Sequence, residues 1–205
     1  MAEPADGTAG DPGEEPAGRV DPRIAQTRAQ VHAATLAVIA ESGVASATVE
    51  RIAERAGVSR STVYRRWPDL PRLYYEAFAQ LARRSAPEPR GDTDRELLHY
   101  LRDYADRLND PTYGAVLVAL IEAAWRDPQL AELRRQVSAE GSSRVAAILE
   151  AGVRAGRLRA DLDRRTALEA VLAPFLYRRL VEQETVTRAD VRRLHADLLD
   201  RLGGP

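Results

Sequence analysis

The sequence predicts an all-α protein of about nine helices, on three observations. Apolar residues recur three and four positions apart through most of the chain, which is the spacing of one face of a helix. Helix-start signals stand between these stretches, among them the Asp-Pro pairs that begin at Asp21, Asp110 and Asp127. No stretch shows the sustained alternation of a strand, and no Asn-Gly pair marks a hairpin.

Residues 21–84 are expected to form a first domain of four helices. Its first helix begins at Asp21-Pro22 and ends before Gly43, and its inward apolar residues are Ile24, Val31, Leu36 and Ile39. Two short helices follow between Thr48 and Trp67, and the fourth begins at Asp69 and ends before a break at 87–91 that contains Pro and Gly. Residues 1–20 are rich in Pro, Gly, Ala and Glu, which predicts a disordered acidic tail.

The stretch from Thr48 to Trp67 has the pattern of a helix-turn-helix. Small Ala53 fits a close approach of two helices, and Gly57 four residues later can adopt the positive φ of a sharp turn. Ser59 is a good N-cap for the second helix. The apolar contacts between the two helices are expected from Ile52, Ala56, Val58 and Val63.

The second of these helices is basic, since it carries Arg60, Arg65 and Arg66 and no acidic residue. Such a helix suits the major groove of DNA, where its first two turns face base edges. We expect Arg60, Ser61 and Arg65 to read bases, because Arg pairs in a bidentate manner with guanine, worth about 1–3 kcal/mol of discrimination. The alternative is an ordinary solvated face.

The segment VYRRW, followed by PDLPRLYYEAF, resembles the tetracycline-repressor (TetR) family. That resemblance implies a three-helix DNA-binding head followed by a helical regulatory and dimerisation domain, which would here span residues 85–205. It also implies phosphate contacts from Thr48, Thr62, Tyr64 and Arg66. Ser59 is a further DNA-binding candidate, and Trp67 is expected in the core. Most relatives place a Lys at the start of the fourth helix; Leu70 stands there, so this contact is expected either to be lost or to pass to Arg72.

Helix starts are also well marked in the C-terminal part of the chain. Thr93 and Glu96 form a capping-box pattern, and Thr187 with Asp190 forms another before the last helix. Asp163 is expected to cap the preceding helix, in which Pro174 should cause a kink or a local break. The last two helices carry long apolar stripes and could pair with a second copy as a four-helix bundle. The interface candidates, which could also be intramolecular core, are Leu176, Leu180, Leu194, Leu198 and Leu202.

The expected helix after Asp110 is apolar nearly all round, which is typical of a buried central helix. Glu122 is its single charge, and a buried carboxylate would need a partner such as a cationic ligand. The alternatives are plain core packing for the aromatic residues and a solvent-facing edge for Glu122. Candidate residues of a small-molecule pocket are Tyr100, Tyr104, Tyr113, Leu117, Ile121, Glu122, Trp125 and Phe175.

Charge and composition limit the function classes. Net charge is −1, but residues 21–84 hold ten Arg and six acidic residues, so the positive excess lies in the helix-turn-helix segment. Cysteine is absent, and neither a signal-peptide pattern nor a spanning apolar run is evident, so a cytoplasmic protein with no membrane partner is expected.

The helix-turn-helix pattern predicts a regulator that binds a palindromic DNA operator as a homodimer. The TetR resemblance, together with the aromatic residues, implies release by a small-molecule effector. An enzyme is not expected, because His32, His99 and His195 have no metal-site spacing and no nucleophile or phosphate-loop motif is present; no cofactor or metal is predicted. The alternative is a sequence-neutral architectural DNA-binding protein, against which the near-zero net charge argues.

Overall fold

The structure, a computed structural model, describes residues 22–82 and 92–204. These residues form nine α-helices and two short helical segments of other types, with no strand beyond one isolated bridge between Leu158 and Gly203. The α-helices are α1 (Pro22–Ser42), α2 (Val49–Ala56), α3 (Arg60–Arg66), α4 (Leu70–Ala82), α5 (Thr93–Asn109), α6 (Pro111–Ala124), α7 (Pro128–Arg154), α8 (Arg164–Leu176) and α9 (Arg188–Leu202). The 3-10 segment η1 (Val44–Ser46) follows α1, and the π-helical segment η2 (Tyr177–Val181) follows α8.

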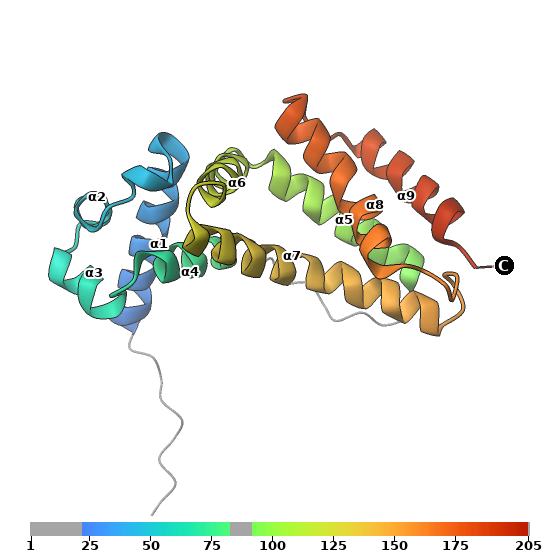
Figure 1. The fold of residues 1–205 in the computed structure, drawn as a ribbon, viewed down its shortest axis with the longest axis horizontal. Coiled ribbons are helices and arrows are strands. Elements are labelled where there is room, and N and C mark those ends of the chain that lie inside the picture. Colours follow the sequence, from blue (N-terminus) through green and yellow to red (C-terminus); the bar gives the residue numbers. More distant parts are fainter. Residues whose placement is uncertain (1–21, 83–91, 205) are drawn as a thin grey trace, which may run out of the picture.

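Helices α1 to α4 form one end of the molecule, which we call the head (Figure 1). Helix α7, the longest, runs from α4 to the far end, where α5 and α8 lie against it and α9 packs on α5 and α8 (Figure 1). Helix α6 packs against both α1 and α7, so it joins the head to the C-terminal helices. The all-α prediction with a helix-turn-helix head is confirmed.

Most predicted helix starts are confirmed by hydrogen bonds. The side chains of Asp110, Asp127 and Asp163 each accept from a backbone N–H of the helix that follows, and Thr187 with Asp190 forms a full capping box. The prediction at Thr93 is wrong, because Asp92 is the N-cap of α5 and accepts from the N–H of Arg95. Both residues are cap formers, and Thr93 is instead buried in the first turn.

Two expectations about burial are also wrong. Ile24 is 41% exposed, because it lies in the first turn of α1 beyond the helices that cover the rest of it. Helix α6 is not buried on all sides, since Val118 is half-exposed and Trp125 directly after it is 86% exposed. The helix therefore keeps an apolar face in solvent.

The C-terminal half of α8 departs from regular geometry after its proline. Pro174 lies within the helix, which continues to Leu176 before the chain becomes π-helical in η2. There the N–H of Glu182 donates to the carbonyl of Tyr177, five residues back. The predicted acidic tail and the domain break at 87–91 lie outside the described residues.

Candidate nucleic-acid interface

The turn between α2 and α3 is built on Gly57. Its φ is +67°, in the left-handed region, and the next residue, Val58, donates its N–H to the carbonyl of Ala53. Ala53 is buried where the two helices meet, as are Ile52 and Val63. The sequence therefore sets the crossing of the two helices through a glycine turn and a small residue at the contact.

Two hydroxyl residues cap the helices of this motif. Thr48 accepts a hydrogen bond from the N–H of Arg51 at 3.3 Å, and Ser59 accepts from the N–H of Thr62 at 3.2 Å. The Ser59 hydroxyl also lies 2.8 Å from the hydroxyl oxygens of Ser61 and Thr62. Donor groups thus gather at the N-terminus of α3, where the helix dipole favours an anion such as a phosphate.

Helix α3 has one buried and one exposed side. Val63 is completely buried, whereas the ring of Tyr64 is 53% exposed. The exposed residues of this short helix are Arg60, Ser61, Tyr64, Arg65 and Arg66. The Arg60 guanidinium lies 3.9 Å from the carboxylate of Glu50 on α2, a long, exposed pair that leaves it able to reach another acceptor.

The C-terminal end of α3 is fixed by Trp67, which is 1% exposed. Its indole N–H donates to the carboxylate of Glu76 on α4 at 3.1 Å, and its ring lies 5.5 Å from that of His32 on α1. The Arg66 guanidinium covers the same ring at 5.8 Å. The expectation that Trp67 belongs to the core between α1, α3 and α4 is confirmed.

Glu76 is the centre of the polar contacts in the head. Besides Trp67 it accepts hydrogen bonds from Arg28 on α1 and from Arg72 on α4, both at 3.2 Å. Burial raises the pKa of Glu76, but the hydrogen bonds from Trp67 and Arg72 and the charge of Arg28 outweigh it, so the pKa lies below its usual value. Glu76 therefore stays ionised and ties three helices together.

Sequence reasoning did not single out Glu76, and it noted His32 only to exclude a metal site. His32 is 3% exposed, its Nδ1 lies 2.5 Å from Gln80, and burial lowers its pKa. The signals that could have found this cluster are the spacing of Arg72 and Glu76, one turn apart, and a histidine among the apolar residues of α1.

A cavity of about 280 Å³ lies in the C-terminal part of the molecule, between α4, α5, α6, α7 and α8. Tyr100 and Tyr104 of α5 stack with ring centroids 6.0 Å apart, and Phe175 of α8 stacks on the far side of Tyr104 at 6.3 Å. Tyr113 of α6 packs on Phe78 of α4 at 5.2 Å. Aromatic rings therefore make up much of the wall.

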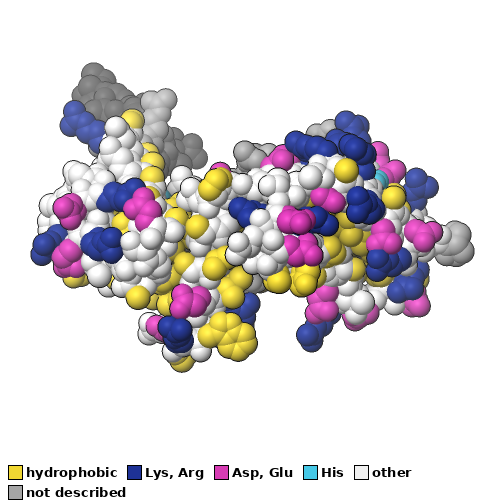
Figure 2. Space-filling model, turned by 90° about the horizontal axis from the view of Figure 1, so that it is seen from above, with side chains coloured by type: hydrophobic (Ala, Val, Ile, Leu, Met, Phe, Trp, Pro, Cys, Tyr) yellow, Lys and Arg dark blue, Asp and Glu magenta, His cyan; other side chains and the backbone are white. Residues whose placement is uncertain are grey.

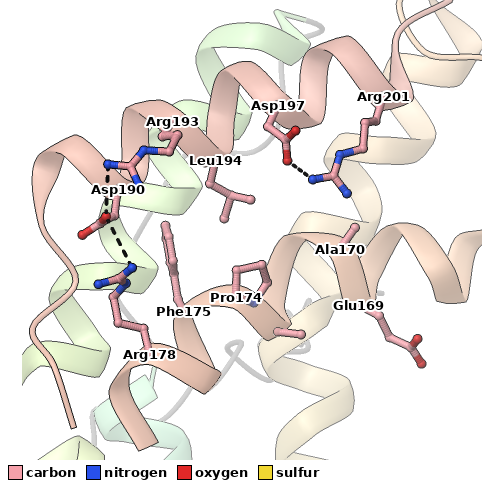
Figure 3. A pocket seen from close by; sticks show the side chains of 11 residues that line it. Glu169, Ala170, Pro174, Phe175, Arg178, Asp190, Arg193, Leu194, Asp197 and Arg201 are labelled. Atoms are coloured by element: carbon pink, nitrogen blue, oxygen red, sulfur yellow. Dashed lines mark hydrogen bonds and ion pairs between the residues drawn. The ribbon is translucent and has the colours of Figure 1, made fainter. Parts of the chain in front are cut away.

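A groove of about 390 Å³ runs between α8 and α9 (Figure 3). Its floor is apolar, with Ala170, Pro174 and Phe175 on α8 and Leu194 on α9. Charged side chains surround it, and three ion pairs join them: Arg178 with Asp190, Arg193 with Asp190, and Arg201 with Asp197. Figure 2 shows the same pattern, with apolar side chains between basic and acidic ones over the C-terminal helices.

The chain matches two family profiles and many known regulators. Residues 32–69 match "Bacterial regulatory proteins, tetR family", and residues 87–198, more than half of the chain, match "Tetracyclin repressor-like, C-terminal domain". The chain belongs to the TetR family. It is a DNA-binding transcriptional regulator with a helix-turn-helix head.

Similar regulators come from several bacteria. The uncharacterised HTH-type regulator Mb2274c of Mycobacterium bovis is 31% identical over 170 residues, which are 82% of this chain and 84% of that protein. YdeS of Bacillus subtilis is 29% identical over 181 residues, which are 84% of this chain and 88% of that protein. The crystal structure of the TetR family regulator SCO0332 is 31% identical, with a TM-score of 0.65 over 85% of this chain and 97% of that one.

Within the TetR family head, the structure places the predicted DNA-binding residues on one exposed surface formed by α3 and the N-termini of α2 and α4. Leu70 is half-buried, and Arg72 lies in the first turn of α4 with its guanidinium on Glu76. The residues of this surface are Thr48, Ser59, Arg60, Ser61, Thr62, Tyr64, Arg65, Arg66 and Arg72. Thr62 is half-buried, and the others are exposed.

The predicted pocket residues divide into two groups. The cavity of this TetR-family protein is lined by Tyr100, Tyr104, Tyr113 and Leu117, with Phe175 stacked behind Tyr104. Ile121, Glu122 and Trp125 lie outside its lining; Glu122 is exposed and pairs with Arg126 at 3.2 Å. The sequence missed the wall residues from α4 and α7 and two basic ones, Phe78, Ala79, Arg107, Val137 and Arg144.

The five predicted interface leucines differ in how exposed they are. Leu198 and Leu202 are buried within one chain, Leu194 is 9% exposed at the floor of the groove, and Leu176 and Leu180 are half-buried. The large apolar residues exposed in this region are instead Tyr177 and Val181 of η2. In the described ranges no helix is long and apolar enough to cross a membrane, and no cluster of His, Asp and Glu there could hold a metal ion.

Proposed function

We propose that this regulator is a homodimeric repressor that leaves a palindromic operator when a small molecule fills the cavity. The observation that carries the proposal is the double role of α4. Its Glu76 holds Trp67 at the end of the recognition helix α3, while Phe78 and Ala79, less than a turn further on, form part of the cavity wall. A ligand that moves this wall therefore moves the element on which α3 is fixed.

Ligand control of this kind needs two arrangements of the helices with different ligand affinity, since a ligand shifts an equilibrium only by its differential binding. Helix α7 supports the coupling, because Glu140 at the cavity accepts a hydrogen bond from the hydroxyl of Tyr75 on α4. In a dimer, a small tilt of α4 changes the separation of the two α3 helices. Two half-sites about 34 Å apart, one turn of DNA, then cannot both be read.

Dimerisation is proposed to occur through α8, η2 and α9. The groove between α8 and α9 combines small apolar residues with a border of balanced charge, which suits a two-fold contact with a second copy. Ala173 and Pro174 are exposed along it, and Tyr177 extends the apolar surface. Replacement of Ala173 by Arg should therefore yield monomers in a light-scattering measurement; a dimer that withstands this change would contradict the proposed interface.

Base reading is proposed for Arg60, Ser61 and Arg65. Phosphate contacts are proposed for Thr48, Ser59, Thr62, Tyr64, Arg66 and Arg72. We further propose that the protein acts in the cytoplasm, without enzymatic activity, cofactor or metal. The exposure of Arg60, Ser61 and Arg65 supports the base-reading assignment.

The test is a quantitative footprint on the DNA upstream of its own gene, at two salt concentrations, with Arg65→Ala and Arg159→Ala. Arg159 lies in the loop between α7 and α8, at the end of the molecule far from the head (Figure 1). A symmetric site that Arg65→Ala weakens about 5- to 150-fold, with a change in base preference, is expected, while Arg159→Ala binds normally. Salt-sensitive, unlocalised binding that is indifferent to Arg65 would indicate an architectural DNA-binding protein instead.

A further inference from the structure

The cavity between α4 and α8 contains a basic side chain with no acidic partner. Arg107 on α5 places its guanidinium 5.6 Å from the ring centroid of Tyr104 and beside the hydroxyls of Tyr100 and Tyr113. The carboxylates next to it on the chain are otherwise engaged: Asp103 pairs with Arg144, Asp106 with Arg188, and Asp110 caps α6. Among the described residues, no carboxylate lies at ion-pair distance from Arg107.

None of the other charged residues at the cavity supplies a carboxylate within ion-pair distance of Arg107. Arg144 of α7 lies 3.6 Å from Asp103, which also faces His99 at 3.4 Å. Glu140 is on the exposed side of the wall, where the hydroxyl of Tyr75 donates to it. Arg107 is thus the cation of this cavity that has no carboxylate partner, whereas Arg144 is paired with Asp103 and its buried Nε has no hydrogen-bond partner in the described part of the chain.

The tyrosine hydroxyls around Arg107 add neutral donors. Burial raises the pKa of Tyr100 to about 12 and also raises that of Tyr113, although Arg107 opposes both shifts. Both hydroxyls therefore keep their protons near neutral pH. The Tyr100 hydroxyl lies beside Arg107, and as a donor it has only a long contact, 3.4 Å, to the carbonyl of Gly141, so its proton can turn to a ligand.

We propose that the cavity takes an aromatic carboxylate of one or two rings, whose acid group pairs with Arg107 while its ring lies among Tyr100, Tyr104 and Tyr113. The proposal rests on ligand-controlled release as proposed above and names the chemical class of the ligand. A volume of about 280 Å³ suits a small ligand of this kind. The planar guanidinium fits a carboxylate in bidentate geometry, and the rings fit an arene.

The experiment compares three probes of nearly equal shape by titration calorimetry on the full chain: 2-naphthoate, neutral 2-naphthamide and cationic 2-naphthylmethylammonium. We expect 2-naphthoate to bind about tenfold tighter than the amide or the ammonium. Arg107→Met keeps the length of the side chain and should remove this preference, and Arg107→Lys should keep part of it. Arg126→Met, an exposed arginine outside the cavity lining, is the matched control and should keep all of it.

Several results would overturn the proposal: equal binding of the acid and the amide, tighter binding of the ammonium, a preference that survives in Arg107→Met, or no binding of any probe at millimolar concentration. The same probes are then added to the complex with operator DNA. Binding of 2-naphthoate through Arg107 without release of DNA would contradict ligand-controlled release and leave the ligand class standing. Release of DNA by only the neutral or only the cationic probe would support ligand-controlled release and contradict the proposed ligand class.

Discussion

The head and the C-terminal helices fill their interiors in different ways. In the head, Val63, Trp67 and Ile52 are at most 1% exposed. The space between α1, α3 and α4 is filled by the packing of Trp67 on His32 and by its hydrogen bond to Glu76. Between α4 and α8 the rings of Tyr100 and Tyr104 leave a cavity instead. A helix that reads base edges must be held in one orientation, whereas a sensor needs space that a ligand can occupy.

The polar groups of the head and of the cavity also differ in the partners that they have. In the head, the charges of Arg28 and Arg72 and the indole of Trp67 all end on one carboxylate, Glu76. At the cavity, Arg107 has no carboxylate and the neighbouring tyrosines have few partners. The contacts to Glu76 hold the helices of the head together, although the buried Nε2 of His32 has no hydrogen-bond partner among the described residues. At the cavity, the guanidinium of Arg107 and the buried Nε of Arg144 can pair with a ligand instead.

The largest effect is expected from removing the ring at the centre of the head. Trp67→Ala should lower the free energy of unfolding by about 3–5 kcal/mol, because it leaves a cavity and removes the indole hydrogen bond to Glu76. The chain has a matched control, since its other tryptophan, Trp125, is 86% exposed. Trp125→Ala should change stability by less than about 0.5 kcal/mol in urea unfolding followed by circular dichroism. Similar losses in the two variants would contradict the burial difference.

A smaller effect is expected from neutralising the carboxylate that joins the three helices. Glu76→Gln should cost about 1–3 kcal/mol, because two guanidinium groups lose their charged acceptor in a half-buried site. It should also weaken operator binding, since Trp67 anchors α3 through the same group. Glu132→Gln on α7 is the control, because the carboxylate of Glu132 lies at the surface and pairs there with Arg135. No measurable change in stability is expected. If Glu76→Gln keeps the stability and the operator affinity of the original protein, Glu76 has no role in DNA binding.

One substitution made in both regions tests the packing difference directly. Val63→Leu adds a methylene where no space exists, and should destabilise the protein by about 1–3 kcal/mol. Val137→Leu adds the same group to the cavity wall, where it can extend into the hollow, and should cost less than about 0.5 kcal/mol. Thermal unfolding of both variants measures the two losses of stability. Equal destabilisation would mean that the cavity is as tightly packed as the head.

The local parts of this fold could be predicted from the sequence, because they depend on neighbouring residues. The Asp-Pro starts at Asp110 and Asp127 and the turn at Gly57 are set by caps and backbone preferences within a few residues. The error at Thr93 has the same origin, since two adjacent cap formers compete and only packing decides that Thr93 is buried.

The cavity could be predicted only in part, because its wall comes from five helices far apart in the sequence. The tyrosines of α5 and α6 were found as an aromatic group, but Arg107 looks like any arginine on a polar face until its neighbours are known. The apolar sequence of α6 suggested burial, yet which face of a helix meets solvent depends on how many helices surround it, as exposed Trp125 shows. Leu198, expected at the interface, belongs to the interior of one chain for the same reason.

The smallest effect is a pH dependence confined to the head. Burial lowers the pKa of His32 below its ordinary value of 6.5, with Arg28 adding to the shift and Gln80 and Glu76 opposing it. As the pH falls below 6.5 the unfolded chain binds the proton first, so the free energy of unfolding should decrease until the folded pKa is reached. His32→Gln should lose this slope, while His99→Gln, at an exposed position on α5, should retain it. A melting temperature that falls equally with pH in the original chain and in His32→Gln would show that other groups cause the dependence.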